Sequence, residues 1–240
     1  MGDIMLVQSY SHGASTKPLI GETLGANFDA AAEKWGERDA LIVRHQNIRW
    51  SYLELQEKVN AFAAGLLNLG LEPGDRVGIW SPNNSEWVVV QYATAKAGLI
   101  LVNINPAYRV AELEYAINKV GCKALILASS FKSSDYVAMV GELAPEISKS
   151  TPGNISCDRL PSLKTVIQIG GKTNDGYFDF GQIPGLASDK DFERLKVLSD
   201  ELQFDDPINI QFTSGTTGFP KGATLTHFNV LNNGYFTGEG

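Results

Sequence analysis

The 240-residue sequence has few cysteines, few histidines and no long apolar run. Two cysteines, Cys122 and Cys157, are too few for a disulfide framework and lack the spacing of a zinc site, which favours a reducing compartment. The longest unbroken apolar stretch, residues 97–102, is far shorter than the roughly 18 residues that a membrane-spanning helix needs. The sequence therefore predicts no transmembrane segment and, from three scattered histidines, no metal-binding cluster.

Positive charge is also scarce. Lysine and arginine number 20 against 27 aspartates and glutamates, so the net charge is −7, and no basic cluster is present. This balance argues against a nucleic-acid or anionic-membrane partner, so any anionic ligand must be held by local groups. The first basic residue is Lys17, so the start resembles neither a secretory signal nor an arginine-rich transit peptide.

Helical and strand patterns alternate along much of the chain. Apolar side chains recur at helical spacing after a Ser51–Glu54 capping-box pattern, which predicts a helix that ends before Gly70. Strand-like residues 76–80 precede a predicted helix over 84–97 and a strand over 99–105. A second such unit has a helix from Pro106 to Gly121 and a strand after it. Alternation of this kind predicts an α/β fold with a mainly parallel sheet flanked by helices.

Outside these units the signals are mixed. Thr23 can cap a helix over 23–35, and two short strands around Gln46–Asn47 predict a hairpin. Residues 141–163 are rich in Pro, Gly and Ser and predict a loop, which a strand over 163–169 follows. We expect 170–203 to be a surface excursion that contains one helix.

The segment most informative about chemistry is 208–227, INIQFTSGTTGFPKGATLTH. An apolar strand leads into a turn rich in glycine and hydroxyl side chains, and a second strand follows. Glycines let successive backbone N–H groups point into one concavity that suits phosphate oxygens. The Walker A spacing is not matched, because Lys221 follows Pro220 and precedes Gly222, so a P-loop hydrolase is a weak alternative. A polar turn without a ligand is a further alternative.

The run TSGTTGFPKG resembles the phosphate loop of the adenylate-forming enzymes, which include acyl-CoA synthetases, luciferases and peptide-synthetase adenylation domains. The resemblance extends upstream through PNNSEWVVVQYATAKAGLILVNINPAY and AELEYAINKVGCKAL. It covers all of residues 1–240 as the N-terminal part of a longer AMP-binding domain, with 22–140 as the first α/β subdomain region and 208–227 as the phosphate-binding loop with its flanking strands. The family's later motifs and its C-terminal domain have no counterpart in these residues.

The resemblance implies an AMP-forming ligase that activates a fatty acid with ATP and transfers the acyl group to CoA. By position, the resemblance assigns phosphate binding to nine consecutive residues: Thr213, Ser214, Gly215, Thr216, Thr217, Gly218, Phe219, Pro220 and Lys221. Lys221 and Thr217 would act in catalysis, Lys221 by offsetting charge on the leaving pyrophosphate. Phe219 and Pro220 would shape the loop, and Mg²⁺ would bridge the phosphates.

The overall resemblance is to medium-chain, mitochondrial members, so a mitochondrial location is expected, with a cytoplasmic one as the alternative. A homo-oligomer is possible. A second hypothesis is a non-catalytic truncated form that binds nucleotide weakly or serves as an interaction module. His227 is expected to begin a helix and pack there rather than act as a base, and both cysteines are expected to be inert.

Overall fold

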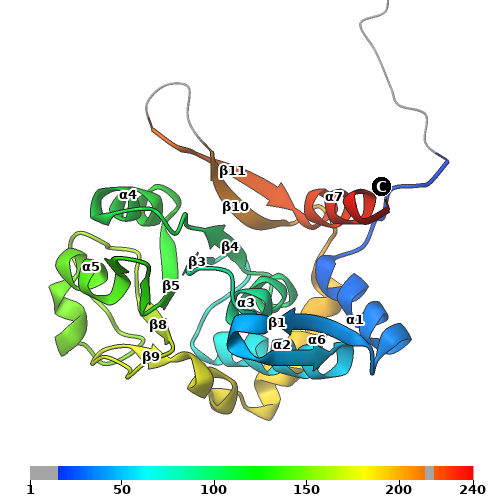
Figure 1. The fold of residues 1–240 in the computed structure, drawn as a ribbon, viewed down its shortest axis with the longest axis horizontal. Helices are drawn as coiled ribbons and strands as arrows, with labels where there is room; N and C mark the ends of the chain where they lie inside the picture. The colour runs from blue at the N-terminus through cyan, green and yellow to red at the C-terminus, as the bar shows by residue number, and fades with distance from the viewer. Residues whose placement is uncertain (1–15, 214–218, 240) are drawn as a thin grey trace, which may run out of the picture.

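The computed structural model describes residues 16–213 and 219–239. Its described part contains a seven-stranded sheet in the order β11-β10-β4-β3-β5-β8-β9 (Figure 1). These strands are β3 Arg76–Trp80, β4 Ile100–Asn103, β5 Cys122–Ala128, β8 Thr165–Ile169, β9 Phe178–Asp179, β10 Pro207–Thr213 and β11 Lys221–Thr226. All neighbours pair in parallel except β10 and β11, which are antiparallel, so the predicted mainly parallel α/β fold is confirmed.

Helices cover both faces of this sheet. One face carries α1 Leu24–Trp35, α2 Tyr52–Asn68, α3 Ser85–Lys96, the 3₁₀ segment η3 Phe180–Leu186 and α6 Asp189–Glu201. The other carries α4 Val110–Val120 and α5 Tyr136–Leu143. Because both faces are covered, β5 is a nearly continuous run of buried apolar residues. The last helix, α7 His227–Glu239, lies beside α1 (Figure 1).

Smaller elements complete the fold. An antiparallel pair separate from the main sheet is formed by β1 Asp39–Val43 and β2 Ile48–Ser51, joined by η1 Arg44–Gln46. The remaining elements are β6 Ser130–Phe131, β7 Ser134–Asp135 and η2 Pro145–Lys149. Among the described residues, no helix is both long enough and apolar enough to cross a membrane.

Local signals located most elements correctly. Thr23 accepts a hydrogen bond from the Ala26 amide at the start of α1, and the predicted Ser51–Glu54 capping box begins α2. The hairpin at Gln46–Asn47 is present, with Asn47 in the left-handed region. Gly121 ends α4 at φ +63°, where a side chain would be strained.

Two expectations were wrong. The helix predicted to begin at Pro106 begins at Val110, because Arg109 is the N-cap and its amide donates to Glu112. The segment 170–203 is only partly a surface excursion. Its β9 extends the main sheet beyond β8, and Ile183 and Leu198 are buried against the helices of that face. In 141–163 the chain is largely irregular, as predicted, apart from the end of α5 and η2.

η3 packs closely against α2, so a larger side chain at the contact should lower the stability of the chain. Replacing glycine by alanine inside a helix normally stabilises it by about 1 kcal/mol. At Gly65, however, a Cβ would lie 2.2 Å from the Ile183 carbonyl oxygen. Gly65→Ala should therefore lower the free energy of unfolding by about 1–3 kcal/mol. Gly141→Ala, in α5 with nothing within 4 Å, is the matched control and should be neutral or stabilising. Urea denaturation measures both, and equal effects would contradict the packing described.

Candidate phosphate-binding site

The predicted phosphate loop joins β10 to β11 at one edge of the sheet. Residues Asn209–Gln211 of β10 pair in parallel with Leu101–Asn103 of β4, so both strands end at the same edge. Ligands of open α/β sheets bind at this carboxyl edge. β11 returns antiparallel to β10 (Figure 1). Thr213 of β10 pairs with Lys221 of β11. The two ends of the predicted loop are therefore held side by side.

Four of the nine predicted site residues lie in the described part of the chain: Thr213, Phe219, Pro220 and Lys221. The hydroxyl of Thr213 donates to the Lys221 carbonyl at 3.4 Å, and Lys221 is exposed. Phe219 is also exposed, with 69% of its surface accessible. The structure thus brings Thr213 and Lys221 together at the base of the loop. The other five, Ser214 to Gly218, among them the predicted catalytic Thr217, lie outside the described residues.

A residue that sequence reasoning missed, Tyr115 of α4, contacts this hairpin. Its hydroxyl donates to the Pro220 carbonyl at 3.0 Å, and its ring stacks on Phe219 with centroids 5.3 Å apart. The only sequence signal was a tyrosine within the amphipathic helix pattern of α4. That pattern shows which side chains face the core, but it gives no information about which strand passes over the opposite face.

His227 begins α7 and packs in the interior, as expected. Its Nδ1 accepts a hydrogen bond from the Leu24 amide at 3.0 Å, which links α7 to the start of α1. Burial lowers the pKa of the imidazole to about 4, although the nearby Asp206 carboxylate acts in the opposite direction. The ring is therefore neutral at pH 7. Its buried Nε2 has no partner within the described residues.

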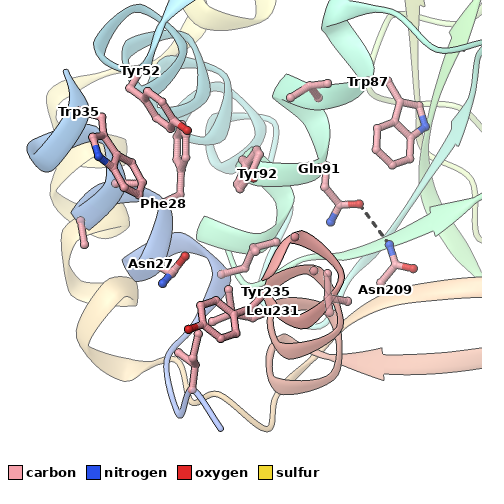
Figure 2. A pocket seen from close by; sticks show the side chains of 18 of the residues that line it. Asn27, Phe28, Trp35, Tyr52, Trp87, Gln91, Tyr92, Asn209, Leu231 and Tyr235 are labelled. Carbon is pink, nitrogen blue, oxygen red and sulfur yellow. Dashed lines mark hydrogen bonds between the residues drawn. The ribbon is translucent and has the colours of Figure 1, made fainter. Parts of the chain in front are cut away.

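A cavity of about 1150 Å³ lies beside β10, between α1, α3 and α7 (Figure 2). Aromatic side chains from these helices and from the start of α2 line it, and Phe28 stacks on Tyr92 with centroids 4.4 Å apart. Burial raises the pKa of Tyr92 above its ordinary value. Gln211 lines the cavity two residues before Thr213, and alternate residues of a strand share a face. The cavity and the first residue of the predicted loop therefore lie on one side of β10.

Three hydrogen-bonded amide side chains form part of the polar cavity wall. Asn103 at the end of β4 donates to Asn209 at 3.4 Å. Asn209 in turn donates to Gln91 of α3, also at 3.4 Å (Figure 2). Two atoms of this chain of amides, Gln91 Nε2 and Asn103 Oδ1, are buried and have no hydrogen-bond partner within the described residues. Sequence reasoning did not identify these residues, although an asparagine between two isoleucines of a buried strand is a recognisable signal.

The described residues contain no group of three or more His, Cys, Asp or Glu that could hold a metal ion. Both cysteines are buried, and burial raises the pKa of the Cys122 thiol to about 12. A thiol with so high a pKa is a poor nucleophile at neutral pH. The polar groups of the predicted loop that the structure does describe are the Thr213 hydroxyl and the ammonium of the exposed Lys221.

Comparison with known proteins decides the family. The AMP-binding enzyme family matches residues 28–238. The chain belongs to this family. The mitochondrial medium-chain acyl-CoA ligase ACSF2 of Danio rerio is 46% identical over 233 residues, which cover 97% of this chain and 38% of that protein. The human ACSF2 protein is 43% identical over 232 residues, again covering 38% of its length.

Solved AMP-binding enzymes share the fold. The crystal structure of the long-chain-fatty-acid-CoA ligase FadD1 from Archaeoglobus fulgidus superimposes with a TM-score of 0.69 and 26% identity. The match covers 95% of this chain and 41% of that one. The family resemblance inferred from residues 213–222 and the upstream segments is therefore confirmed, and the chain spans well under half the length of these relatives.

The burial of His227 predicts how the stability of this chain depends on pH. An unfolded imidazole titrates near pH 6.5 and the folded one near 4, so between these values the unfolded chain binds more protons. The free energy of unfolding should therefore fall as the pH falls from 7 to 5. His227→Gln, which keeps an acceptor for the Leu24 amide, should remove about 1–2 kcal/mol of that fall. Urea denaturation at both pH values measures it, and equal falls in the two proteins would contradict the neutral, buried ring.

Proposed function

We propose that this chain is the N-terminal part of an AMP-forming fatty acid–CoA ligase and holds the nucleotide's phosphates at the β10–β11 hairpin. The observation that carries the proposal is the pairing of Thr213 with the exposed Lys221 at the carboxyl edge of the sheet. The family assignment and the acyl-CoA ligases among the relatives support it. Residues 22–140 would form the first subdomain region, and 208–227 the phosphate-binding region.

The proposed reaction has two steps. A carboxylate oxygen of the fatty acid attacks the α-phosphorus of ATP, and the bond to the bridging oxygen breaks to give acyl-adenylate and pyrophosphate. The thiol of CoA then attacks the acyl carbon, loses its proton and displaces AMP. Thr213 and the residues Ser214 to Gly218 would donate hydrogen bonds to the β- and γ-phosphates. Lys221 would offset the charge that develops on pyrophosphate.

Mg²⁺ fits this chemistry as a partner of the phosphates. Phosphate oxygens are the hard ligands that Mg²⁺ prefers, and it often keeps several waters. The hairpin supplies hydroxyls and an ammonium rather than carboxylates, so the described residues would hold the phosphates and not the metal. Magnesium would supply further charge neutralisation there.

The substrate class and location are proposed from the relatives. The two relatives reported above are named as medium-chain and mitochondrial enzymes, and we extend both properties to the whole protein that contains this chain. The cavity beside β10 adds an apolar surface on the face that leads to Thr213, as an enzyme acting on a fatty acid requires.

Binding of MgATP to the purified chain tests the phosphate site. Lys221→Ala removes one charge-assisted phosphate contact, so calorimetry should show affinity weaker by about 1–3 kcal/mol. Lys190→Ala, which removes an exposed lysine of α6 on a helix that packs against α2, is the matched control and should bind as the wild type does. An equal loss of MgATP affinity in both variants would mean that Lys221 acts only through the net charge of the chain and makes no specific phosphate contact. Absence of binding by the wild type would instead favour the non-catalytic interaction module.

The products of turnover test the reaction class. In a protein that carries this segment at the full length of its relatives, addition of a medium-chain fatty acid and MgATP should release AMP and pyrophosphate, and addition of CoA should release the thioester. Chromatography of the nucleotides distinguishes the outcomes. ADP and inorganic phosphate as products would exclude an adenylate intermediate and contradict the proposal.

A further inference from the structure

Tyr115 contacts both sides of the β10–β11 hairpin. Its ring lies 6.4 Å from that of Phe212, next to the last residue of β10, in a tilted arrangement. The same ring stacks on Phe219 at an interplanar angle of 28°. Its hydroxyl donates to the Pro220 carbonyl. One half-buried side chain therefore bridges Phe212, which precedes the predicted loop, and Phe219 and Pro220, which lie near its end.

The helix that carries Tyr115 is itself firmly held. Leu113, Ala116 and Ile117 of α4 are completely buried, on the face of the sheet that carries α4 and α5. Glu114 accepts two hydrogen bonds from the Arg159 guanidinium, at 3.0 and 2.6 Å, which lowers the pKa of the carboxyl. Asn118 donates to the Arg159 carbonyl at 2.8 Å. Tyr115 therefore projects from an element that cannot shift without disturbing the core.

The contact with Pro220 acts directly on Lys221. The Pro220 carbonyl and the Lys221 amide belong to one planar peptide group. A hydrogen bond that fixes this carbonyl fixes the plane and hence the place of the Lys221 Cα. The next residue, Gly222, also lies close to this helix. A Cβ built on it would be 3.7 Å from the Val120 side chain of α4. The segment Phe219–Gly222 is thus seated along α4.

We propose that Tyr115 is a positioning residue that seats Phe219–Lys221 against α4 and so sets the place of Lys221 for phosphate binding. The second part rests on the proposed function. Phe219, although exposed and apolar, has a role in this arrangement, since its ring is the surface on which Tyr115 stacks. A tyrosine is required for both contacts, because phenylalanine can stack but cannot donate, and leucine can do neither.

Three variants of the chain separate these contacts. Tyr115→Phe removes only the hydroxyl, and Tyr115→Leu removes the ring as well. Tyr108→Phe is the matched control, because Tyr108 packs against the same core but its hydroxyl has no hydrogen-bond partner among the described residues. Hydrogen–deuterium exchange of the peptide 219–226 reports on the segment itself. Calorimetry with MgATP and with inorganic pyrophosphate reports on phosphate binding.

Tyr115→Phe should speed amide exchange of peptide 219–226 several-fold. It should also weaken the affinity for MgATP and for pyrophosphate about three- to tenfold, the factor expected for one lost hydrogen bond. Tyr115→Leu should have a larger effect, and Tyr108→Phe none. The melting temperature of Tyr115→Phe should match that of the wild type, which separates positioning from a general loss of stability. Wild-type exchange and affinity in Tyr115→Phe, or equal changes in Tyr108→Phe, would overturn the proposal.

The two measurements report on separate properties: ligand affinity reports on the phosphate site, and amide exchange reports on how Phe219–Lys221 is held against α4. If the wild type binds neither MgATP nor pyrophosphate, the phosphate site is contradicted, and the exchange data alone decide the role of Tyr115. Faster exchange in Tyr115→Phe would then still establish that the hydroxyl seats Phe219–Lys221. Unchanged exchange would overturn that as well.

Discussion

Parallel pairing of β10 with β4 is the contact on which the placement of the candidate site depends. It joins residues 209–211 to residues 101–103, more than a hundred positions earlier in the chain. Without it the hairpin would have no fixed relation to the carboxyl edge of the sheet, where α/β proteins bind ligands. The buried Ile208 and Ile210 hold β10 in place through the apolar contacts that they make on either side of it.

The two faces of the sheet contribute differently to the site. The face that carries α4 and α5 provides a rigid support, through which Tyr115 contacts the hairpin. The other face provides the cavity, lined by aromatic side chains and by the amides of Gln91, Asn103 and Asn209. The hairpin stands where these two surfaces meet, with Lys221 at the base of its loop.

Features that depend on neighbouring residues were predictable from the sequence. The Ser51–Glu54 capping box, the glycine that ends α4 and the strand–loop–strand pattern around 208–227 involve residues close in sequence, so their patterns are visible without a fold. The start of α4 was misplaced because a proline such as Pro106 often begins a helix, whereas the hydrogen bond from the Arg109 backbone amide to the Glu112 carboxylate sets the helix start.

Features that depend on distant residues could not be predicted in this way. Strand β9 has only two residues, so it carries no periodicity, and only its pairing with β8 makes it a strand. The bond from the Leu24 amide to His227 joins residues 203 positions apart, and Tyr115 is 105 positions from Pro220. The sequence still predicted correctly that His227 packs in the interior, because it stands at the start of an apolar helix pattern. Its partner, the Leu24 amide, could not be predicted.

Backbone amide NMR shifts of the isotope-labelled chain, recorded as MgATP is added, would locate the bound phosphates. If the hairpin holds them, the largest shifts fall on Thr213, on Phe219 and Lys221 to Gly222, and on Tyr115 of α4. The amides of Gln91 and Asn103, deep in the cavity wall, should shift little. Shifts concentrated on those cavity residues, with the hairpin unchanged, would contradict phosphate binding at the β10–β11 hairpin.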